Sequence, residues 1–154
     1  MQLADILGPE AVKIFPSVSS KKRLFQELGD LMEQTHGLNS GLVLDALQER
    51  ETLGPTGVGN GIALPHARLD GLDKVVGAFI RVEKPLEFSA VDRQPVDLIF
   101  ALFAPEDAGV DHLKALALVS RMMRVSGKVS MLRSNTDIQT LYTILTERQS
   151  SHAA

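Results

Sequence analysis

The segments VVGAFIRV (75–82) and VDLIFALF (96–103) decide the class of fold that this sequence predicts. Both have the length of a strand and are apolar at odd and even positions alike, and Pro105 closes the second. Strands that are apolar on both faces usually lie inside a sheet that helices cover on each side. We therefore predict a central sheet with helices against both of its faces.

Helical patterns surround these two segments. A helix is predicted from an N-cap at Ser19 to about His36, with Gly37 as its stop, because apolar side chains recur there at helical spacing. A second is expected over 40–50, with these side chains inward: Leu42, Val43, Ala46 and Leu47. Residues 11–15 form a short β-prone run ahead of them.

Three more helices are expected after the second strand. They cover 111–124, a short stretch around Val129, and 136–148, the last with these side chains inward: Ile138, Leu141, Tyr142 and Leu145. Together, the elements predict an α/β sandwich in which helices flank a mixed sheet. The strand order does not follow from this pattern.

The composition excludes several classes of protein. A chain of 154 residues suits one domain with its own core. The absence of cysteine removes disulfides, cysteine-ligated metals and a cysteine nucleophile. The net charge of -3 disfavours nucleic-acid binding. The longest apolar run, 98–104, is far shorter than the about 20 residues of a membrane span. With no secretory signal at the N-terminus, we expect a cytoplasmic protein.

The stretch RETLGPTGVGNGIALPHAR (50–68) carries the candidate chemistry. It predicts an irregular glycine-rich loop over 54–61, a short extended run, and then His66. Such a loop is either a tight connection or a candidate phosphate-binding site, because glycine lets backbone N–H groups approach an anion. The positions assigned to the phosphate-binding loop are Thr56, Gly57, Gly59 and Asn60. A nucleotide-binding P-loop is excluded, because the loop has no Gly-Lys-Ser/Thr and leads into a strand.

Two residues outside the loop are further candidates. Arg50 lies on the apolar stripe of its helix, at the end nearest the loop, where it either snorkels or meets an anion. Glu49 and Glu51 beside it are expected on a solvated face. His112 lies in the first turn of a later helix, where it is either a satisfied core histidine or a group close to an anion.

These residues together resemble a known family. GVGNGIALPHAR around His66, ERE around Arg50, FSAVDRQPVDLIFALFAP and the His112 helix are similar to enzyme IIA of the fructose/mannitol type, a domain of the phosphoenolpyruvate-dependent sugar phosphotransferase system. The likeness is strongest to its nitrogen-regulatory branch, the PtsN type. It spans roughly residues 3–148, taken as one EIIA type-2 domain before a flexible tail at 149–154.

The resemblance implies a three-layer α/β/α sandwich and a role for each candidate. His66 matches the phosphorylated histidine and would attack through Nε2, Arg50 matches the arginine near the phosphoryl group, and His112 matches the second active-site histidine. Family members commonly have serine where this chain has Pro55, so a hydroxyl contact is missing at that position, while Thr56 remains.

A phosphoryl relay follows as a hypothesis. His66 would attack a phosphohistidine on a phosphocarrier protein, with its Nδ1–H donating to a carbonyl of the glycine loop. Arg50 would neutralise the phosphoryl oxygens, and His112 would donate to them. No metal or other cofactor is required. An apolar rim for the carrier is expected at Leu64, Pro65 and Ala67.

The resemblance favours a regulator over a transport component, because no IIB-like or membrane segment accompanies the domain. Its expected partners are the phosphocarrier and regulated targets such as potassium-transport or sensor proteins. The alternative is a sugar-specific IIA that passes phosphate to a IIB domain. A metal-dependent hydrolase using His66 and His112, and an interaction module without phosphate chemistry, remain as further alternatives.

Overall fold

The computed structural model describes residues 1–147, so the tail expected over 149–154 lies outside them. The helices are α1 (Leu3–Ile6), α2 (Lys21–His36), α3 (Ser40–Thr52), α4 (Val110–Met122), α5 (Ser126–Ser134) and α6 (Ile138–Thr146), with one 3-10 turn at Pro9–Ala11. The strands are β1 (Val12–Phe15), β2 (Gly57–Gly59), β3 (Ile62–Ala63), β4 (His66–Leu69), β5 (Val76–Leu86) and β6 (Val96–Pro105).

The strands form one mixed sheet. Its order is β1-β5-β6-β3-β2, and β4 also pairs with β6, further along the same edge as β3. The β5–β6 and β2–β3 pairs are antiparallel, whereas β1 runs parallel to β5, and β3 and β4 run parallel to β6. Because β3 and β4 share one edge of β6, the short break at Leu64 and Pro65 brings His66 to the start of β4.

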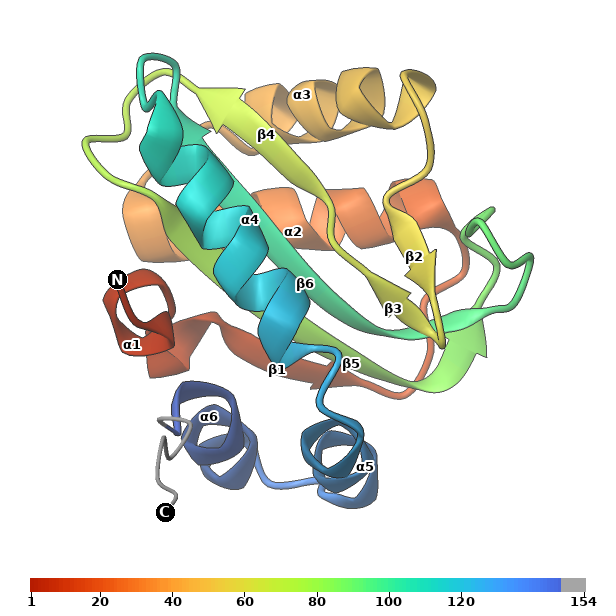
Figure 1. Ribbon diagram of the computed structural model, residues 1–154. Helices are drawn as coiled ribbons and strands as arrows, with labels where there is room; N and C mark the ends of the chain where they lie inside the picture. The colour runs from red at the N-terminus through yellow and green to blue at the C-terminus, as the bar shows by residue number, and fades with distance from the viewer. Residues whose placement is uncertain (148–154) are drawn as a thin grey trace.

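Helices cover both faces of this sheet (Figure 1). In the view of Figure 1, α2 and α3 lie behind the strands, and α4 crosses in front of β6. α1 contacts α4 and α6, and α6 contacts β1. The predicted α/β sandwich is therefore confirmed, with the sheet as its middle layer. Within residues 1–147, no helix combines the length and the apolar character needed to cross a membrane.

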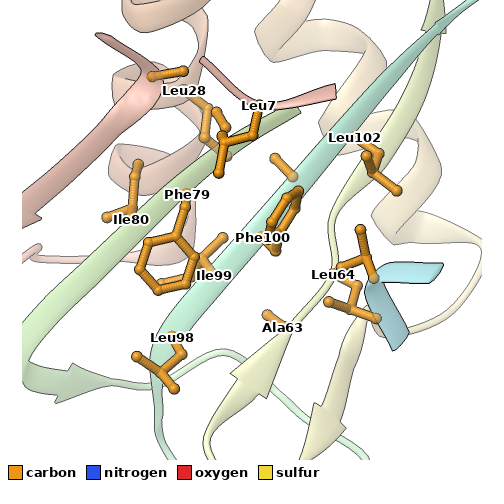
Figure 2. Close-up of a cluster of buried hydrophobic side chains, with 14 of the residues drawn as sticks. Leu7, Leu28, Ala63, Leu64, Phe79, Ile80, Leu98, Ile99, Phe100 and Leu102 are labelled. Carbon is orange, nitrogen blue, oxygen red and sulfur yellow. The ribbon is translucent and has the colours of Figure 1, made fainter. Parts of the chain in front are cut away.

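The centre of the core is the β5–β6 pair, as the two apolar segments predict. Every residue of β6 except Asp97 is buried. Phe79 lies opposite Phe100 across the two strands, with ring centroids 6.2 Å apart. Figure 2 shows these side chains together with Leu7 and Leu28, which come from segments outside the sheet. Burial on both faces makes this strand pair the rigid platform on which the edge strands β3 and β4 rest.

Most predicted helix boundaries are confirmed, but one N-cap and the burial of two side chains differ from the prediction. The N-cap of α2 is Ser20, not Ser19: the Ser20 side chain accepts a hydrogen bond from the Arg23 amide at 3.0 Å. Leu42 is 63% exposed, because α3 buries Val43 and Leu47 instead. Ile138 is 41% exposed at the very start of α6, whose buried side chains begin one turn later.

The glycine-rich segment is more regular than predicted. Residues 57–59 form β2, which pairs with β3 in a tight hairpin. Gly57 is required by a close approach, since a Cβ there would lie 2.7 Å from the Cβ of Ala90. Gly61 has φ 78°, a left-handed conformation that favours glycine at the hairpin turn. The glycines therefore serve to fit the hairpin against its neighbours.

Candidate functional site

The fold brings together the three residues that the sequence analysis selected for chemistry. Arg50 projects from the last turn of α3, His66 is the first residue of β4, and His112 lies in the first turn of α4. The Arg50 Nε donates to His66 Nε2 at 3.2 Å. The rings of His66 and His112 lie edge to face, with centroids 5.5 Å apart. Residues separated by as many as 62 positions in the chain thus form one cluster.

The hydrogen bonds of His66 determine its tautomer. Nδ1 lies 2.9 Å from the carbonyl oxygen of Leu64, which can only accept, so Nδ1 carries the proton. Nε2 faces the Nε–H of Arg50, which can only donate, so Nε2 presents its lone pair. The acceptor for Nδ1–H is therefore a carbonyl just before β4, not one within the glycine loop as we expected. The half-buried ring is held as a neutral imidazole with Nε2 as its nucleophilic atom.

Arg50 is held at two points. Besides the contact to His66, one terminal nitrogen of the guanidinium donates to the Gly54 carbonyl oxygen at 3.0 Å. Its side chain is half-buried at the helix end. This geometry differs from a snorkelling arginine, because the guanidinium turns inward to the histidine. An incoming anion bound to Nε2 would meet a cation already in place.

His112 is buried, with 6% of its surface exposed, while Leu113 next to it is 63% exposed. Its Nε2 is buried and has no hydrogen-bond partner among the described residues. A satisfied core histidine, one of the two readings left open by the sequence, would have a partner at this atom. The position beside His66 and the free ring nitrogen together favour a polar group arriving from outside the chain.

Both rings are biased toward the neutral form. Burial lowers the pKa of His66 below its usual 6.5, and the charge of Arg50 lowers it further, against opposing effects of the Leu64 carbonyl and the Glu51 carboxylate. Burial also lowers the pKa of His112 to about 4, with smaller contributions from His66 and Arg68. Neutral rings at pH 7 suit a nucleophile and a nearby hydrogen-bonding group.

The low pKa of His112 predicts a pH-dependent stability. An unfolded histidine titrates near 6.5, so between pH 6.5 and 4 the unfolded chain binds a proton that folded His112 does not. The free energy of unfolding is therefore expected to fall by roughly 2–3 kcal/mol as the pH decreases from 7 to 4. Denaturant titrations at stepped pH measure this slope.

The matched variants are His112→Gln and His36→Gln. His112→Gln removes the titrating ring, so the free energy of unfolding should change less steeply with pH. The pH dependence that remains should come from His66, whose pKa is also lowered. His36, exposed at the end of α2, is the control and should keep the wild-type slope. Equal slopes for wild type and His112→Gln would contradict the prediction.

Thr56 has a different contact from the one predicted for a phosphate-binding loop. Its hydroxyl donates to Glu51 Oε1 at 2.6 Å and its amide to Glu51 Oε2 at 3.1 Å. Glu51, expected on a solvated face, is in fact largely buried: its side chain is 9% exposed and also pairs with Lys21. The glutamate therefore binds the loop that follows its own helix.

The other loop positions lie in the β2–β3 hairpin. Gly57 and Gly59 belong to β2, and the Asn60 amide donates to the Asp92 carboxylate at 3.1 Å. The Asn60 carbonyl accepts from Arg133, which also pairs with Asp97. The hairpin is thus tied to the segment after β5, to β6 and to α5. A phosphate-binding role for these four positions stays a prediction.

The prediction of an exposed apolar rim for the phosphocarrier is wrong. Leu64, Pro65 and Ala67 are all buried, because β3 and β4 pair with β6 at this edge. The exposed apolar side chains next to the site residues are instead Leu53, just after α3, and Leu113, next to His112.

Sequence reasoning missed Arg68 and Glu51 as neighbours of the site. Arg68 follows His66 by two residues in β4, so the two share one face of the strand, and its charge contributes to lowering the pKa of His112. That alternation could have indicated Arg68 once a strand was assigned to 66–69. The role of Glu51 depends on the fold of residues 53–56, which no local pattern reveals.

The site offers little to a metal ion. Within residues 1–147, no three His, Cys, Asp or Glu side chains are grouped so that they could share one. The lone pair of His66 Nε2 also faces the positive guanidinium of Arg50. The arrangement is better suited to an anionic group, so the metal-dependent hydrolase gains no support.

Comparison with known proteins decides the family. A family model described as phosphoenolpyruvate-dependent sugar phosphotransferase system, EIIA 2, matches residues 5–148. The chain belongs to this family. As an EIIA 2 protein it is a component of the phosphotransferase system, and the expected family is confirmed.

Relatives of this EIIA 2 protein include nitrogen regulatory proteins. That of Bradyrhizobium diazoefficiens is 43% identical over 145 residues, which cover 94% of this chain and 95% of the relative. The crystal structure of the nitrogen regulatory protein IIA-Ntr from Neisseria meningitidis has a TM-score of 0.87 and 38% identity, covering 94% of this chain and 99% of that one. The resemblance to the nitrogen-regulatory branch is thus confirmed.

The fold is also found in a sugar-specific protein. The crystal structure of mannitol IIA from Escherichia coli has a TM-score of 0.76 at 18% identity, and covers 90% of this chain and 97% of that one. At this identity the likeness establishes the shared fold only.

Proposed function

We propose that this protein is a regulatory phosphoryl relay. His66 accepts a phosphoryl group from a histidine phosphocarrier protein, and its phosphorylation state controls nitrogen- and potassium-related target proteins. The observation that carries the proposal is the pair of hydrogen bonds on His66, to Leu64 at Nδ1 and from Arg50 at Nε2. Together they keep the proton on Nδ1, leave Nε2 as the nucleophilic nitrogen, and place a cation next to the position that a phosphoryl group would occupy.

The transfer step exchanges one nitrogen–phosphorus bond for another. The lone pair of His66 Nε2 forms the new bond to phosphorus, and the bond to the carrier imidazole breaks, with its electron pair staying on the carrier nitrogen. The proton on His66 Nδ1 remains there, hydrogen-bonded to the Leu64 carbonyl. Because both phosphoryl carriers are histidines, the step is nearly balanced and reversible.

The cluster around His66 supplies the electrostatic part of catalysis. Arg50 now donates to Nε2, and a phosphoryl group placed at that atom would meet the same guanidinium with its oxygens. His112, with a free ring nitrogen, is the second group for those oxygens. Binding of the phosphoryl oxygens by both groups stabilises charge that develops during transfer.

Regulation follows from the position of the site. Phosphorylation adds about −1.5 to −2 charges at pH 7. The exposed apolar side chains Leu53 and Leu113 are close in sequence to Arg50 and His112. A partner that covers His66 and also contacts these side chains would therefore sense the added charge. Relatives named nitrogen regulatory proteins support nitrogen-related targets.

The second candidate function is that of a sugar-specific IIA, which passes phosphate to a IIB domain. A relative from Haloferax volcanii with 38% identity, covering 68% of each chain, is named a fructose-specific EIIA component. Incubation of the phosphorylated protein with purified IIB domains separates the two candidates. Rapid transfer to a fructose- or mannitol-type IIB favours transport, whereas a stable label favours regulation.

Intact-mass spectrometry after incubation with the complete phosphoenolpyruvate-dependent relay tests the shared proposal. The expected result is one added phosphoryl group, stable in base and labile in acid, as for a nitrogen-linked phosphate. An unlabelled protein would instead favour an interaction module without phosphate chemistry.

A further inference from the structure

Glu51 is a largely buried carboxylate with three hydrogen-bond donors. Oε2 accepts from Lys21 Nζ at 2.9 Å and from the Thr56 amide at 3.1 Å, and Oε1 accepts from the Thr56 hydroxyl at 2.6 Å. Lys21, at the start of α2, also lies over the Phe88 ring, 4.7 Å from its centroid. Burial of a charge is costly unless such partners are present. The contacts show that the carboxylate joins α2, α3 and the segment that leads into β2.

Two consecutive residues of α3 hold the same short segment. Arg50 donates to the Gly54 carbonyl. Glu51 accepts hydrogen bonds from the amide and the hydroxyl of Thr56, which lies two residues after Gly54. The Gly54 carbonyl is also the second anchor of the guanidinium that faces His66. The Gly54 amide also donates to the main-chain carbonyl of Glu51 at 3.2 Å. The anchor is therefore held on one side by the end of α3 and on the other by the contacts of the Glu51 side chain with Thr56.

We propose that Glu51 is a positioning residue for phosphoryl transfer: it fixes residues 53–56 so that the Gly54 carbonyl keeps the Arg50 guanidinium against His66. This inference rests on the proposed function of His66. Glu51 does not touch the reacting atoms, so it acts through Arg50. Displacement of a catalytic group by about 1 Å can cost 10²-fold in rate, which is the reason that the anchor matters.

The carboxylate also contributes to the electrostatics at His66. Arg50 contacts His66 from α3, His112 contacts it from α4, and Arg68 follows it on β4. The Glu51 carboxylate is bound to Lys21 and Thr56 and acts on His66 through its charge. The negative charge of Glu51 opposes the lowering of the pKa of His66 by burial and by Arg50. Removal of that charge should therefore move the pKa of His66 further down, which is a signature that general loosening of the structure would not produce.

The test compares Glu51→Gln with Glu49→Gln in the full-length protein. Glu49 is exposed on the same helix and serves as the matched control. For Glu51→Gln we expect kcat for phosphorylation by the carrier to fall about 10- to 100-fold, with KM unchanged, and a lower pKa of His66 by NMR titration. Glu49→Gln should keep the wild-type values of all three quantities.

Glu51→Asp separates the geometry from the charge and keeps the inference testable if Glu51→Gln does not fold. Its carboxylate retains the charge but is one methylene shorter, so it cannot hold both Lys21 and Thr56. We expect kcat to fall about tenfold with a smaller change in the pKa of His66. Wild-type kcat in either folded variant would overturn the inference.

The outcomes also distinguish this inference from the proposed function. If the wild-type protein takes up no phosphoryl group, the proposed function fails, whatever the variants do. In that case two results for Glu51→Gln would still show that Glu51 positions Arg50 against His66. These are a lowered pKa of His66 and a shifted NMR signal of the Arg50 Nε–H. Unchanged NMR signals would overturn the positioning role as well.

Discussion

Replacement of His66 by alanine is expected to abolish uptake of a phosphoryl group. The variant lacks the only ring whose Nε2 lone pair is presented to Arg50 in the cluster. We do not expect His112 to replace it, because the His112 ring is buried and the Leu64 carbonyl orients His66 alone. Intact-mass spectrometry after incubation with the phosphoenolpyruvate-dependent relay measures the loss.

His36→Ala is the matched control for this variant. His36 is exposed at the end of α2, so its removal should leave both folding and labelling as in the wild type. Undiminished labelling of His66→Ala, in a protein that remains folded by circular dichroism, would remove His66 from the mechanism. The acid-labile phosphate would then have to lie on another histidine.

Arg50→Ala is expected to slow phosphoryl transfer by roughly 10²–10³, the usual cost of removing one preorganised donor from a site of developing charge. The guanidinium reaches His66 Nε2 and is itself anchored on Gly54. Arg50→Lys keeps the charge but loses the planar donors, so its rate should lie between those of Arg50→Ala and the wild type. Rapid-quench measurement of single-turnover phosphorylation gives these rates directly.

Arg23→Ala is the matched control for Arg50→Ala, because it removes an arginine far from His66 in the sequence. Arg23 is an exposed residue of α2 that pairs with Glu27 four residues later, and such surface pairs contribute little to stability. Its variant should phosphorylate at the wild-type rate. If Arg50→Ala also kept that rate, Arg50 would be a structural residue that only holds the Gly54 carbonyl.

The core strands were predictable because a strand that is buried on both faces is apolar at nearly every position of its sequence. The run 96–103 falls within β6, and 75–82 largely overlaps β5, which continues to Leu86. Leu42 and Ile138 were misassigned because helical spacing shows that a residue is apolar, not which other element covers it. The extended run before His66 is confirmed as β3, but the sequence predicts a loop where β2 lies. Glycines weaken strand propensity, and Gly57 is required there by close packing against Ala90.

The sequence indicated which three residues form the central cluster, but not which contacts they make. His66, Arg50 and His112 followed from their local patterns and the family resemblance, and the fold brings them together. The burial of Leu64 and the role of Glu51 were not predictable. Both depend on the tertiary structure: Leu64 lies between β3 and β4, which pair with β6, and Glu51 pairs with Lys21 of α2.

The sequence by itself determined the layered α/β class and the family, and it selected His66, Arg50 and His112 as candidates for phosphoryl transfer, because apolar periodicity, motifs and residue types are local properties. Only the tertiary structure decided which groups hold the two ring nitrogens of His66, where Arg50 is anchored, and which apolar side chains remain exposed. Hydrogen-bond partners and solvent exposure arise from the pairing of segments far apart in the chain. They exist only once the sheet and its covering helices have formed.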